Sequence, residues 1–216
     1  MSLKKKRRAL VFASGDFSVQ MLAGLSPEPG DVVVCVDGGL VHCLKTGWSP
    51  TLLLGDMDSV PAGLLKRSDI ASVEIQRHPV GKDASDLELA LLWLTEQAVS
   101  EVILTGISGR RTDHMLFNWL LVAQREWPFR LRMLDESTNA VLVTPVFPLR
   151  LSVKPGQIVS LLALRTVSHL TTTGLQYALS DAKLERGSTR GLSNVVLEST
   201  IGLRIADGAL LVLLIR

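Results

Sequence analysis

The chain has 216 residues, which is enough for one large domain or two smaller ones, and its composition is that of a globular protein. Its 23 Lys and Arg nearly balance its 21 Asp and Glu, so the charge gives no case for a nucleic-acid partner. No apolar run approaches the roughly 20 residues that span a bilayer, so we also expect no membrane partner. Because no signal peptide is visible and the two cysteines, Cys35 and Cys43, form no metal-binding pattern, we expect a cytoplasmic location.

The first 135 or so residues alternate between short apolar runs and helical stretches, which predicts an open α/β sheet. The apolar runs are continuous rather than alternating, as is typical of parallel strands that are buried on both faces. We therefore expect a Rossmann-like, open parallel sheet. In chain order the predicted strands are ALVFAS, DVVVCV, TLLLG, SVEIQ, EVILTG and RLRML.

Two helices are predicted between these strands. The first begins at Ser85, which forms a capping box with Glu88 three residues later. The second begins near Asp113. The apolar residues that we expect to face inward are Leu87, Ala90, Leu91, Leu94 and Ala98 in the first helix, and Leu116, Trp119, Leu120 and Ala123 in the second.

The character of the sequence changes after about Asn139, where prolines become frequent and the helical period ends. Several short runs then follow, QIVSLLAL, GLQYAL, NVVLES, GLRIA and ALLVLLI, and they favour a small all-β sandwich. Pro155-Gly156 predicts a turn, and Asp207-Gly208 predicts a type I′ hairpin between the last two runs. We therefore expect an α/β domain of residues 1–138 and a β-sandwich domain of residues 139–216.

Polar and Gly-rich clusters follow four of the predicted strands. Because ligands of open α/β sheets bind at the carboxyl ends of the strands, we expect these clusters to meet at one edge. Taken singly, each cluster has a structural alternative: a tight turn, a helix-start carboxylate for Asp86 or Asp113, or a surface charge for Arg111. The clusters are Asp37-Gly38-Gly39; Asp56 and Asp58; Lys82, Asp83, Ser85 and Asp86; and Ser108, Gly109, Arg110, Arg111 and Asp113.

Asp56 and Asp58 are the most informative pair, because two like charges so close together cost free energy unless a cation or hydrogen-bond donors share them. A metal site, a phosphoaspartate site and an ordinary loop start are all open explanations. Several carboxylates at one edge suit Mg²⁺, which binds oxygen ligands together with substrate phosphates. Backbone N–H groups of Gly38, Gly39 and Gly109 could approach phosphate oxygens. The chain contains no GxxxxGK[ST] sequence, so we do not expect a P-loop enzyme.

The motifs DGG, GDMDS, KDASD and GISGRRTDHMLFN occur in the order and spacing of the thiamine pyrophosphokinases, which the chain resembles from about Ala9 to Arg216. PGQIVSLLAL, GLQYAL and GLSN continue the match in the C-terminal half. The resemblance implies an N-terminal α/β domain that binds ATP and magnesium, and a C-terminal β-sandwich that binds thiamine. It also implies a homodimer with active sites between subunits. The implied reaction transfers pyrophosphate from ATP to the hydroxyl of thiamine and releases AMP.

The resemblance also implies roles for the clustered residues. Asp56, Asp58 and Asp86 would be the catalytic carboxylates and the metal ligands. A second group would contact ATP and its phosphates. A third would bind thiamine, one member by stacking on a thiamine ring and two by lining its pocket from the partner subunit. The residues implied to contact ATP are Asp37, Gly38, Gly39, Lys82, Asp83, Ser85, Arg111 and Asp113. Tyr177 would stack on the thiamine ring, and Ser193 and Asn194 would line the thiamine pocket.

Two positions depart from the family pattern. Arg110 occupies a position that is usually glycine, which puts the phosphate role of Arg111 in question, and Ser85 replaces the usual threonine.

Two other function classes stay open. DMDSV resembles the nucleophile motif of haloacid-dehalogenase phosphatases, in which Asp56 would be phosphorylated and Asp58 would be the acid/base. The other class is a non-catalytic protein of the same fold that binds nucleotide or thiamine.

Overall fold

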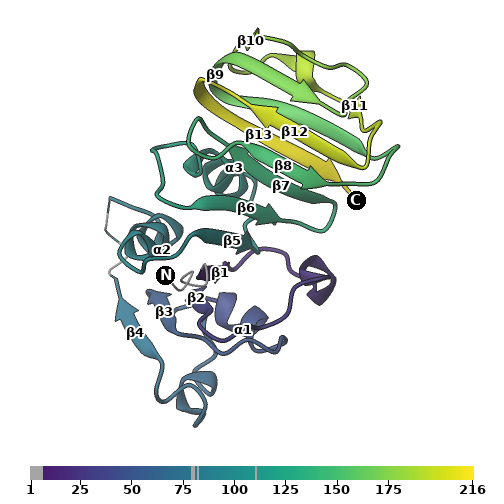
Figure 1. Ribbon diagram of the computed structural model, residues 1–216. Helices are drawn as coiled ribbons and strands as arrows, with labels where there is room; N and C mark the ends of the chain where they lie inside the picture. The colour runs from purple at the N-terminus through teal and green to yellow at the C-terminus, as the bar shows by residue number, and fades with distance from the viewer. Residues whose placement is uncertain (1–6, 79–80, 82, 110) are drawn as a thin grey trace, which may run out of the picture. The chain divides into compact units, whose positions relative to one another are not determined.

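The computed structural model describes residues 7–78, 81, 83–109 and 111–216 (Figure 1). Lys82 and Arg110 therefore lie outside the described residues. The chain divides into two compact units. The first comprises the residues up to Leu121 together with Trp127–Glu136, and the second comprises Val122–Glu126 together with Ser137–Arg216.

The first unit contains a parallel sheet, as the continuous apolar runs predict. Its strand order is β4-β3-β2-β1-β5-β6, and every neighbouring pair in that order is parallel. Each predicted strand of this unit is present. The strands are β1 Arg8–Phe12, β2 Val32–Val36, β3 Leu52–Gly55, β4 Glu74–Arg77, β5 Glu101–Thr105 and β6 Arg130–Leu134.

Burial of these strands depends on their place in the sheet. β1, β2, β3 and β5 are buried along nearly their whole length, whereas β4 is mostly exposed and its Ile75 is 39% exposed. The prediction of a buried strand is wrong for β4, because this strand lies at the sheet edge, where neighbouring elements cover less of it.

Helix α2 (Asp86–Thr95) begins as the capping box predicts, because the Glu88 backbone N–H donates to Ser85 Oγ over 3.2 Å. Its predicted inward face is buried except at Ala98, which lies beyond the end of the helix with φ 52°. The buried residues of this face are Leu87, Ala90, Leu91 and Leu94.

Helix α3 (Thr112–Leu121) starts close to the predicted position, and Ala123, just beyond its end, is buried as predicted, but the prediction of a buried face is wrong within the helix. None of its residues is buried, and Leu116 and Leu120 are 53% and 48% exposed. Apolar spacing specifies the face of a helix and not the neighbour that would cover it.

The other helices described are α1 Gly39–Cys43 and the 3-10 helices η1 Val19–Leu22, η2 Leu64–Lys66 and η3 Thr189–Gly191. Across the described residues, none of the helices combines the length and the apolarity needed to span a membrane.

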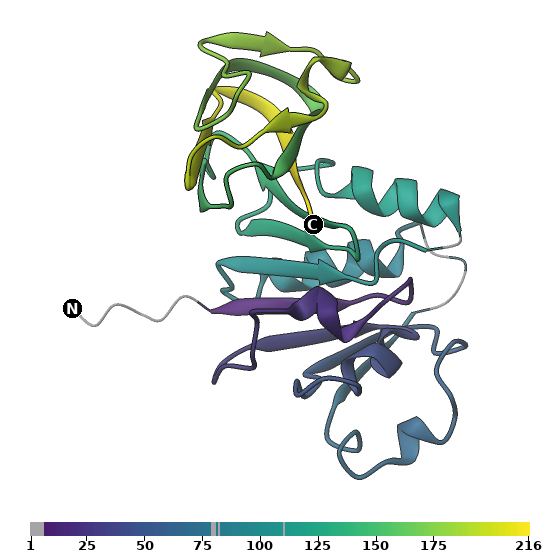
Figure 2. The same ribbon diagram turned by 90° about the vertical axis from the view of Figure 1, so that its right-hand side faces the viewer.

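The second unit is built from antiparallel strands around one apolar core, as the strand-rich runs predict. Its strand order is β7-β13-β9-β12-β8, with β10 and β11 also paired to β9. The long strand β9 (Ile158–Thr173) pairs with β13 from Val159 to Ser168 and with β12 from Thr171 to Thr173. Figure 2 shows that the strands of this unit are strongly curved. The other strands are β7 Thr138–Val143, β8 Leu149–Ser152, β10 Ala182–Leu184, β11 Asn194–Val195, β12 Thr200–Arg204 and β13 Asp207–Ile215.

Only one of the two predicted turns of this unit is correct. The turn at Pro155-Gly156 is confirmed, with Gly156 at φ 85°. The hairpin predicted at Asp207-Gly208 is wrong, because the strands on either side both pair with β9 and no ladder in the described part of the chain joins them to each other. Gly208 instead lies at an irregularity of β13 with φ 98°, where a Cβ would lie 2.3 Å from the Thr166 carbonyl oxygen.

Candidate active site

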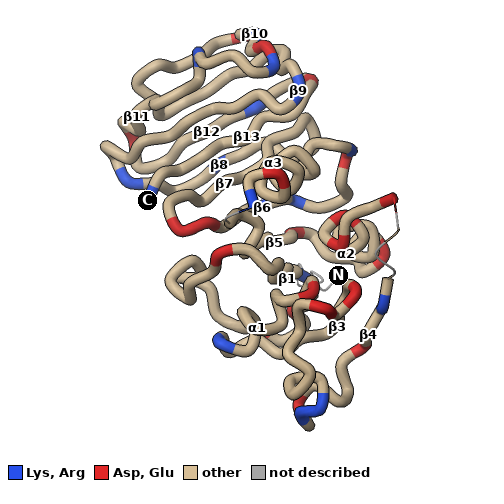
Figure 3. Tube along the Cα trace, turned by 180° about the vertical axis from the view of Figure 1, so that it is seen from behind, with Lys and Arg blue, Asp and Glu red and all other residues tan. Residues whose placement is uncertain are grey.

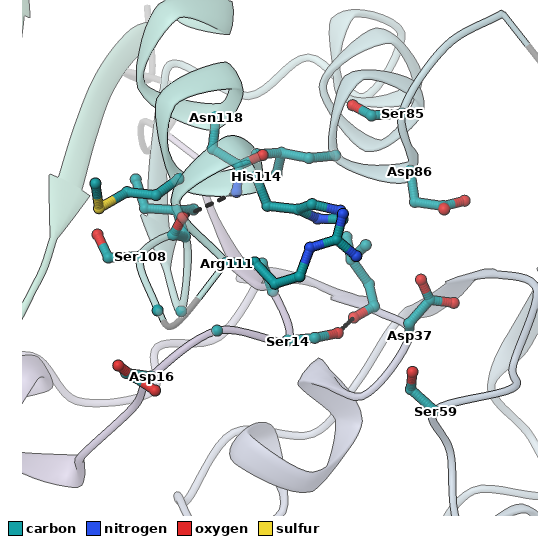
Figure 4. A pocket seen from close by; sticks show the side chains of 18 of the residues that line it. Ser14, Asp16, Asp37, Ser59, Ser85, Asp86, Ser108, Arg111, His114 and Asn118 are labelled. Carbon is teal, nitrogen blue, oxygen red and sulfur yellow. Dashed lines mark hydrogen bonds between the residues drawn. The ribbon is translucent and has the colours of Figure 1, made fainter.

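A cleft of about 720 Å³ lies at the carboxyl ends of β1, β2 and β5 in the first unit (Figure 4). The strand order reverses at this point, since β1 has β2 on one side and β5 on the other. Ligands of open α/β sheets bind at such reversal points, outside the carboxyl ends of the strands. The residues of the predicted clusters that line the cleft are Asp37, Asp83, Ser85, Asp86, Ser108, Gly109 and Arg111.

Asp37 directly follows β2 and reaches the end of β3. Its Oδ1 accepts a hydrogen bond from the Met57 N–H over 3.3 Å, while its own N–H donates to the Leu54 carbonyl over 3.0 Å. Asp37 and Met57 both have left-handed conformations, with φ 46° and 70°, which residues other than glycine rarely adopt. Such conformations persist where surrounding contacts fix them, and here those contacts join the DGG and GDMDS motifs.

Gly55 allows this approach between the ends of β2 and β3. It has φ 141°, and a Cβ at this position would lie 1.7 Å from Asp37 Oδ1. We expect Gly55→Ala to displace the Asp37 carboxylate and to lower the free energy of unfolding by about 1–3 kcal/mol, the usual cost of such a backbone conformation. Urea unfolding followed by circular dichroism measures the change.

Gly63→Ala is the matched control for this substitution. Gly63 has φ −67°, and nothing lies within 4 Å of a Cβ added to it. Its replacement should change the free energy of unfolding by at most about 1 kcal/mol, and in the stabilising direction. A Gly55→Ala protein as stable as the Gly63→Ala protein would contradict the proposed steric role of Gly55.

Gly38 and Gly39 open helix α1 against β1. A Cβ on Gly39 would lie 1.9 Å from the Phe12 carbonyl oxygen, so glycine is required for this close packing of helix and strand. Gly38 is the N-cap of the helix. The close approach of Gly39 to the Phe12 carbonyl explains why one position of the DGG motif is glycine. Phosphate binding by the backbone N–H groups of Gly38 and Gly39 stays a prediction.

Asp56 and Asp58 follow β3 but do not line the cleft. Asp56 Oδ1 accepts a hydrogen bond from the Asp58 N–H over 2.9 Å, which forms an Asx-turn at the start of the loop. Within the described residues, no group of three or more His, Cys, Asp or Glu side chains is placed to hold a metal ion. Figure 3 shows acidic positions near β3 and α2. A metal site shared by Asp56, Asp58 and Asp86 stays a prediction.

The start of α2 borders the cleft through Asp83, Ser85 and Asp86. Ser85 caps the helix, and Asp86 lies in its first turn, where the helix dipole stabilises a carboxylate by about 0.3–1 kcal/mol. Figure 4 shows the side chains of Asp37 and Asp86 on the same side of the cleft, with Arg111 reaching toward the middle. Residues of the DGG and KDASD motifs, which GDMDS separates in the sequence, thus border one space.

Arg111 lines the cleft and forms a bidentate ion pair with Asp113, with Nε–Oδ1 and Nη2–Oδ2 distances of 3.1 and 2.5 Å. Hydrogen bonding from this guanidinium holds the pKa of the Asp113 carboxyl well below its usual range. Both side chains are exposed, so solvent screens the pair and the guanidinium can exchange this carboxylate for a phosphate. Asp113, which does not line the cleft, is the partner of Arg111 in this structure.

The loop between β5 and α3 is anchored by two side chains of α3. Asn118 Nδ2 donates to the Ile107 carbonyl over 2.9 Å, and Trp119 Nε1 donates to Ser108 Oγ over 3.1 Å. Ile107, Ser108 and Asn118 all line the cleft. The Asn of the GISGRRTDHMLFN motif therefore holds one wall of the cleft in place.

Ser14, Asp16 and Ser59, which are not among the residues predicted from the sequence, also line the cleft. A signal was available for Ser14 and Asp16, because they follow strand β1 as the other clusters follow their strands. Gly15 lets this loop approach the loop after β5, where a Cβ would lie 1.9 Å from a carbonyl oxygen. His42 supports the same loop with Nε2 2.9 Å from the Gly15 carbonyl oxygen, and burial lowers the pKa of its imidazole.

The predicted thiamine-binding residues lie together in the second unit. Tyr177 is 63% exposed, whereas Asn194 is 4% exposed. The backbone N–H and carbonyl of Tyr177 both hydrogen-bond to the Asn194 side chain, each over 3.0 Å. Ser193 is exposed and has φ 55°. The strand predicted for GLQYAL is wrong, because this segment forms an isolated bridge at Leu175 and then a turn.

Two family models match the chain. The thiamin pyrophosphokinase catalytic domain matches residues 28–129, and the thiamin pyrophosphokinase vitamin B1 binding domain matches residues 147–210. A thiamine pyrophosphokinase of Bacillus subtilis (strain 168) is 28% identical over 180 residues, which cover 82% of this chain and 84% of that protein.

Solved structures give the same result. The crystal structure of thiamine pyrophosphokinase from Bacillus subtilis has a TM-score of 0.81 and 25% identity, with 97% of this chain and 99% of that chain covered. The structure of thiamin pyrophosphokinase from Geobacillus thermodenitrificans has a TM-score of 0.79 and 26% identity, with 97% of both chains covered. Together with the ordered motifs, these matches confirm that the chain belongs to the thiamine pyrophosphokinase family.

Proposed function

We propose that this protein transfers pyrophosphate from ATP to the hydroxyl group of thiamine, giving thiamine diphosphate and AMP. The observation that carries the proposal is the cleft at the reversal point of the sheet, where Asp37, Asp86 and Arg111 meet in a chain of this family. Phosphoryl-group transfer depends on positioning and charge stabilisation more than on covalent chemistry by the protein. Carboxylates, hydroxyls and a guanidinium around one cleft supply those needs.

The cleft is the proposed binding site for the ATP phosphates. The Ser85 hydroxyl accepts the Glu88 N–H and can give its own proton to a phosphate oxygen, whereas the Ser14 hydroxyl already donates to the Val36 carbonyl over 3.1 Å. Arg111 can bind a phosphate bidentately after it releases Asp113. The helix that begins after Ser85 adds backbone N–H groups at its N-terminus.

The carboxylates at this edge fit Mg²⁺, a hard cation that takes oxygen ligands and is often held by one or two carboxylates plus substrate phosphates. Asp37 and Asp86, which line the cleft, meet that requirement, and the sequence adds Asp56 and Asp58 as further proposed ligands. A bound ion would neutralise phosphate charge. The thiamine hydroxyl proton is assigned to one of the same carboxylates, Asp86 or Asp58.

Thiamine binding is assigned to the second unit, as a vitamin B1 binding domain over residues 147–210 supports. The exposed Tyr177 ring suits a flat cationic heterocycle, since a ring face attracts positive charge by about 0.5–2 kcal/mol.

We further propose a Rossmann-like catalytic domain of residues 1–138 and a thiamine-binding and dimerisation domain of residues 139–216. The proposed assembly is a cytoplasmic homodimer whose active sites form between subunits.

The phosphatase alternative has no support. GDMDS follows β3, beside the edge strand β4, whereas the phosphatase nucleophile usually ends the first strand. The Asp56 carboxylate also accepts the Asp58 N–H. The non-catalytic alternative is excluded by any turnover of thiamine.

The products test the proposed function. Incubation with ATP, thiamine and magnesium should give AMP and thiamine diphosphate in equal amounts, because both terminal phosphates move together. Chromatographic separation of the nucleotides and the thiamine esters measures this ratio. ADP with thiamine monophosphate would contradict pyrophosphate transfer, and a phosphoaspartate trapped at Asp56 would favour the phosphatase class.

A further inference from the structure

Asn194 is almost fully buried, and its amide is engaged with the backbone rather than free for a ligand. Its Oδ1 accepts hydrogen bonds from the N–H groups of Tyr177 and Val195 over 3.0 and 2.9 Å, and its Nδ2 donates to the Tyr177 carbonyl over 3.0 Å. A primary amide offers two acceptor and two donor positions, so three of the four are used here. Both backbone groups of Tyr177 are thus bound by one side chain.

The GLSN sequence builds this arrangement against β9. A Cβ on Gly191 would lie 2.2 Å from the Leu161 carbonyl oxygen, so only glycine lets the segment pass this close to the strand. Ser193 then adopts φ 55°, and its N–H donates to Ser160 Oγ over 3.0 Å. The segment is therefore fixed on β9 immediately before Asn194.

The loop that carries Tyr177 is anchored on both sides of this residue. Before it, the Gln176 N–H donates to the Val195 carbonyl over 2.9 Å, in line with the bridge between Leu175 and Val196. After it, the Leu179 N–H donates to Thr172 Oγ1 over 2.9 Å. Asn194 extends the first anchor by one residue, to the backbone of Tyr177 itself.

Packing alone fixes the Tyr177 ring only weakly, because 63% of the residue is exposed. The direction of an exposed ring depends instead on the backbone from which it projects. We propose that Asn194 is a positioning residue, whose amide holds the Tyr177 backbone so that the exposed ring is oriented for thiamine. This inference rests on the proposed function, because thiamine is the ligand that it invokes.

The composition of the chain provides a direct probe. Tyr177 is the single tyrosine, so incorporation of 3-fluorotyrosine into the full-length chain places one fluorine label on this ring. In the ligand-free protein, Asn194→Ala should shift or broaden the ¹⁹F resonance. The KM for thiamine should rise on the order of 10- to 100-fold, as expected for a misplaced contact group, while the KM for ATP stays near the wild-type value.

Asn194→Asp provides a second, milder variant. It keeps the shape and the Oδ1 acceptor but replaces the donor to the Tyr177 carbonyl, so it should change the resonance and the KM for thiamine in the same direction. Asn139→Ala is the matched control. Asn139 belongs to β7 of the same unit, and its buried Oδ1 has no hydrogen-bond partner in the described chain, so this change should leave both readouts near wild type.

The outcomes separate the two proposals. A folded Asn194→Ala protein with the wild-type resonance and the wild-type KM for thiamine would overturn the positioning role. If Asn194→Ala does not fold, an Asn194→Asp protein that keeps both wild-type readouts would overturn it equally. The proposed function fails in a different way, when the wild-type protein itself produces no thiamine diphosphate.

Discussion

Asp86→Asn should lower the turnover of thiamine with ATP and magnesium by about 100-fold or more, the usual loss when a preorganised charge-stabilising group is removed. The substitution keeps the side-chain shape and removes one negative charge from the cleft at the start of α2. The free energy of unfolding should fall by about 0.3–1 kcal/mol, the typical loss when a carboxylate is removed from the first turn of a helix. Steady-state kinetics and urea unfolding measure the two quantities.

Glu88→Gln is the matched control for this loss of charge. Glu88 lies in the same first turn of α2 but does not line the cleft, so its replacement should leave turnover near the wild-type value. Equal losses in the two variants would mean that the charge at the helix end, and not the cleft carboxylate, supports turnover. A loss in Asp58→Asn as large as that in Asp86→Asn would support the metal site predicted from the sequence.

Mixing two weakly active variants should restore activity if the active sites are shared between subunits. Asp86→Asn changes the cleft, and Tyr177→Ala removes the ring proposed to stack on thiamine. In a symmetric dimer with random exchange, about half of the dimers are mixed and each has one site free of both substitutions. The recovered activity, assayed at limiting thiamine, should therefore approach about a quarter of the wild-type value.

Two controls make this experiment decisive. Differently tagged chains verify that mixed dimers form, and their formation without any recovery of activity would mean that each site lies within one subunit. A mixture of Asp86→Asn and Asp37→Asn should recover nothing, because both changes fall in the same cleft and every site then carries one of them.

The sequence by itself determined the parallel strands, the start of α2 and the family. Continuous apolar runs predict buried strands because a strand covered on both faces excludes polar side chains, and β1, β2, β3 and β5 follow that rule. The Ser85 cap is equally local, since its hydroxyl binds the N–H three residues later. Four short motifs in a fixed order then sufficed to indicate the thiamine pyrophosphokinases.

Only the tertiary structure decided which of the polar clusters border the cleft. Every cluster follows a strand, but the loop after each strand determines where its side chains point. Asp37 lies at the cleft, with Gly55 leaving room for its carboxylate, whereas Asp56 turns back onto the Asp58 N–H. Asp16 lines the cleft because a glycine brings its loop against the next one.

The partners of the strands, and the burial of apolar helix faces, were also decided by contacts between residues distant in the sequence. Asp207-Gly208 has the local chemistry of a hairpin, yet both adjoining strands pair with β9, because the core of the second unit forms around that long strand. The apolar spacing of α3 predicts a helix correctly but does not supply a neighbour for Leu116. Asn194 was predicted from a motif to contact a ligand, and only the folded chain shows that its amide holds the backbone of Tyr177. A sequence pattern records local preferences, whereas the partner of each hydrogen bond and of each apolar face is set by where distant segments meet.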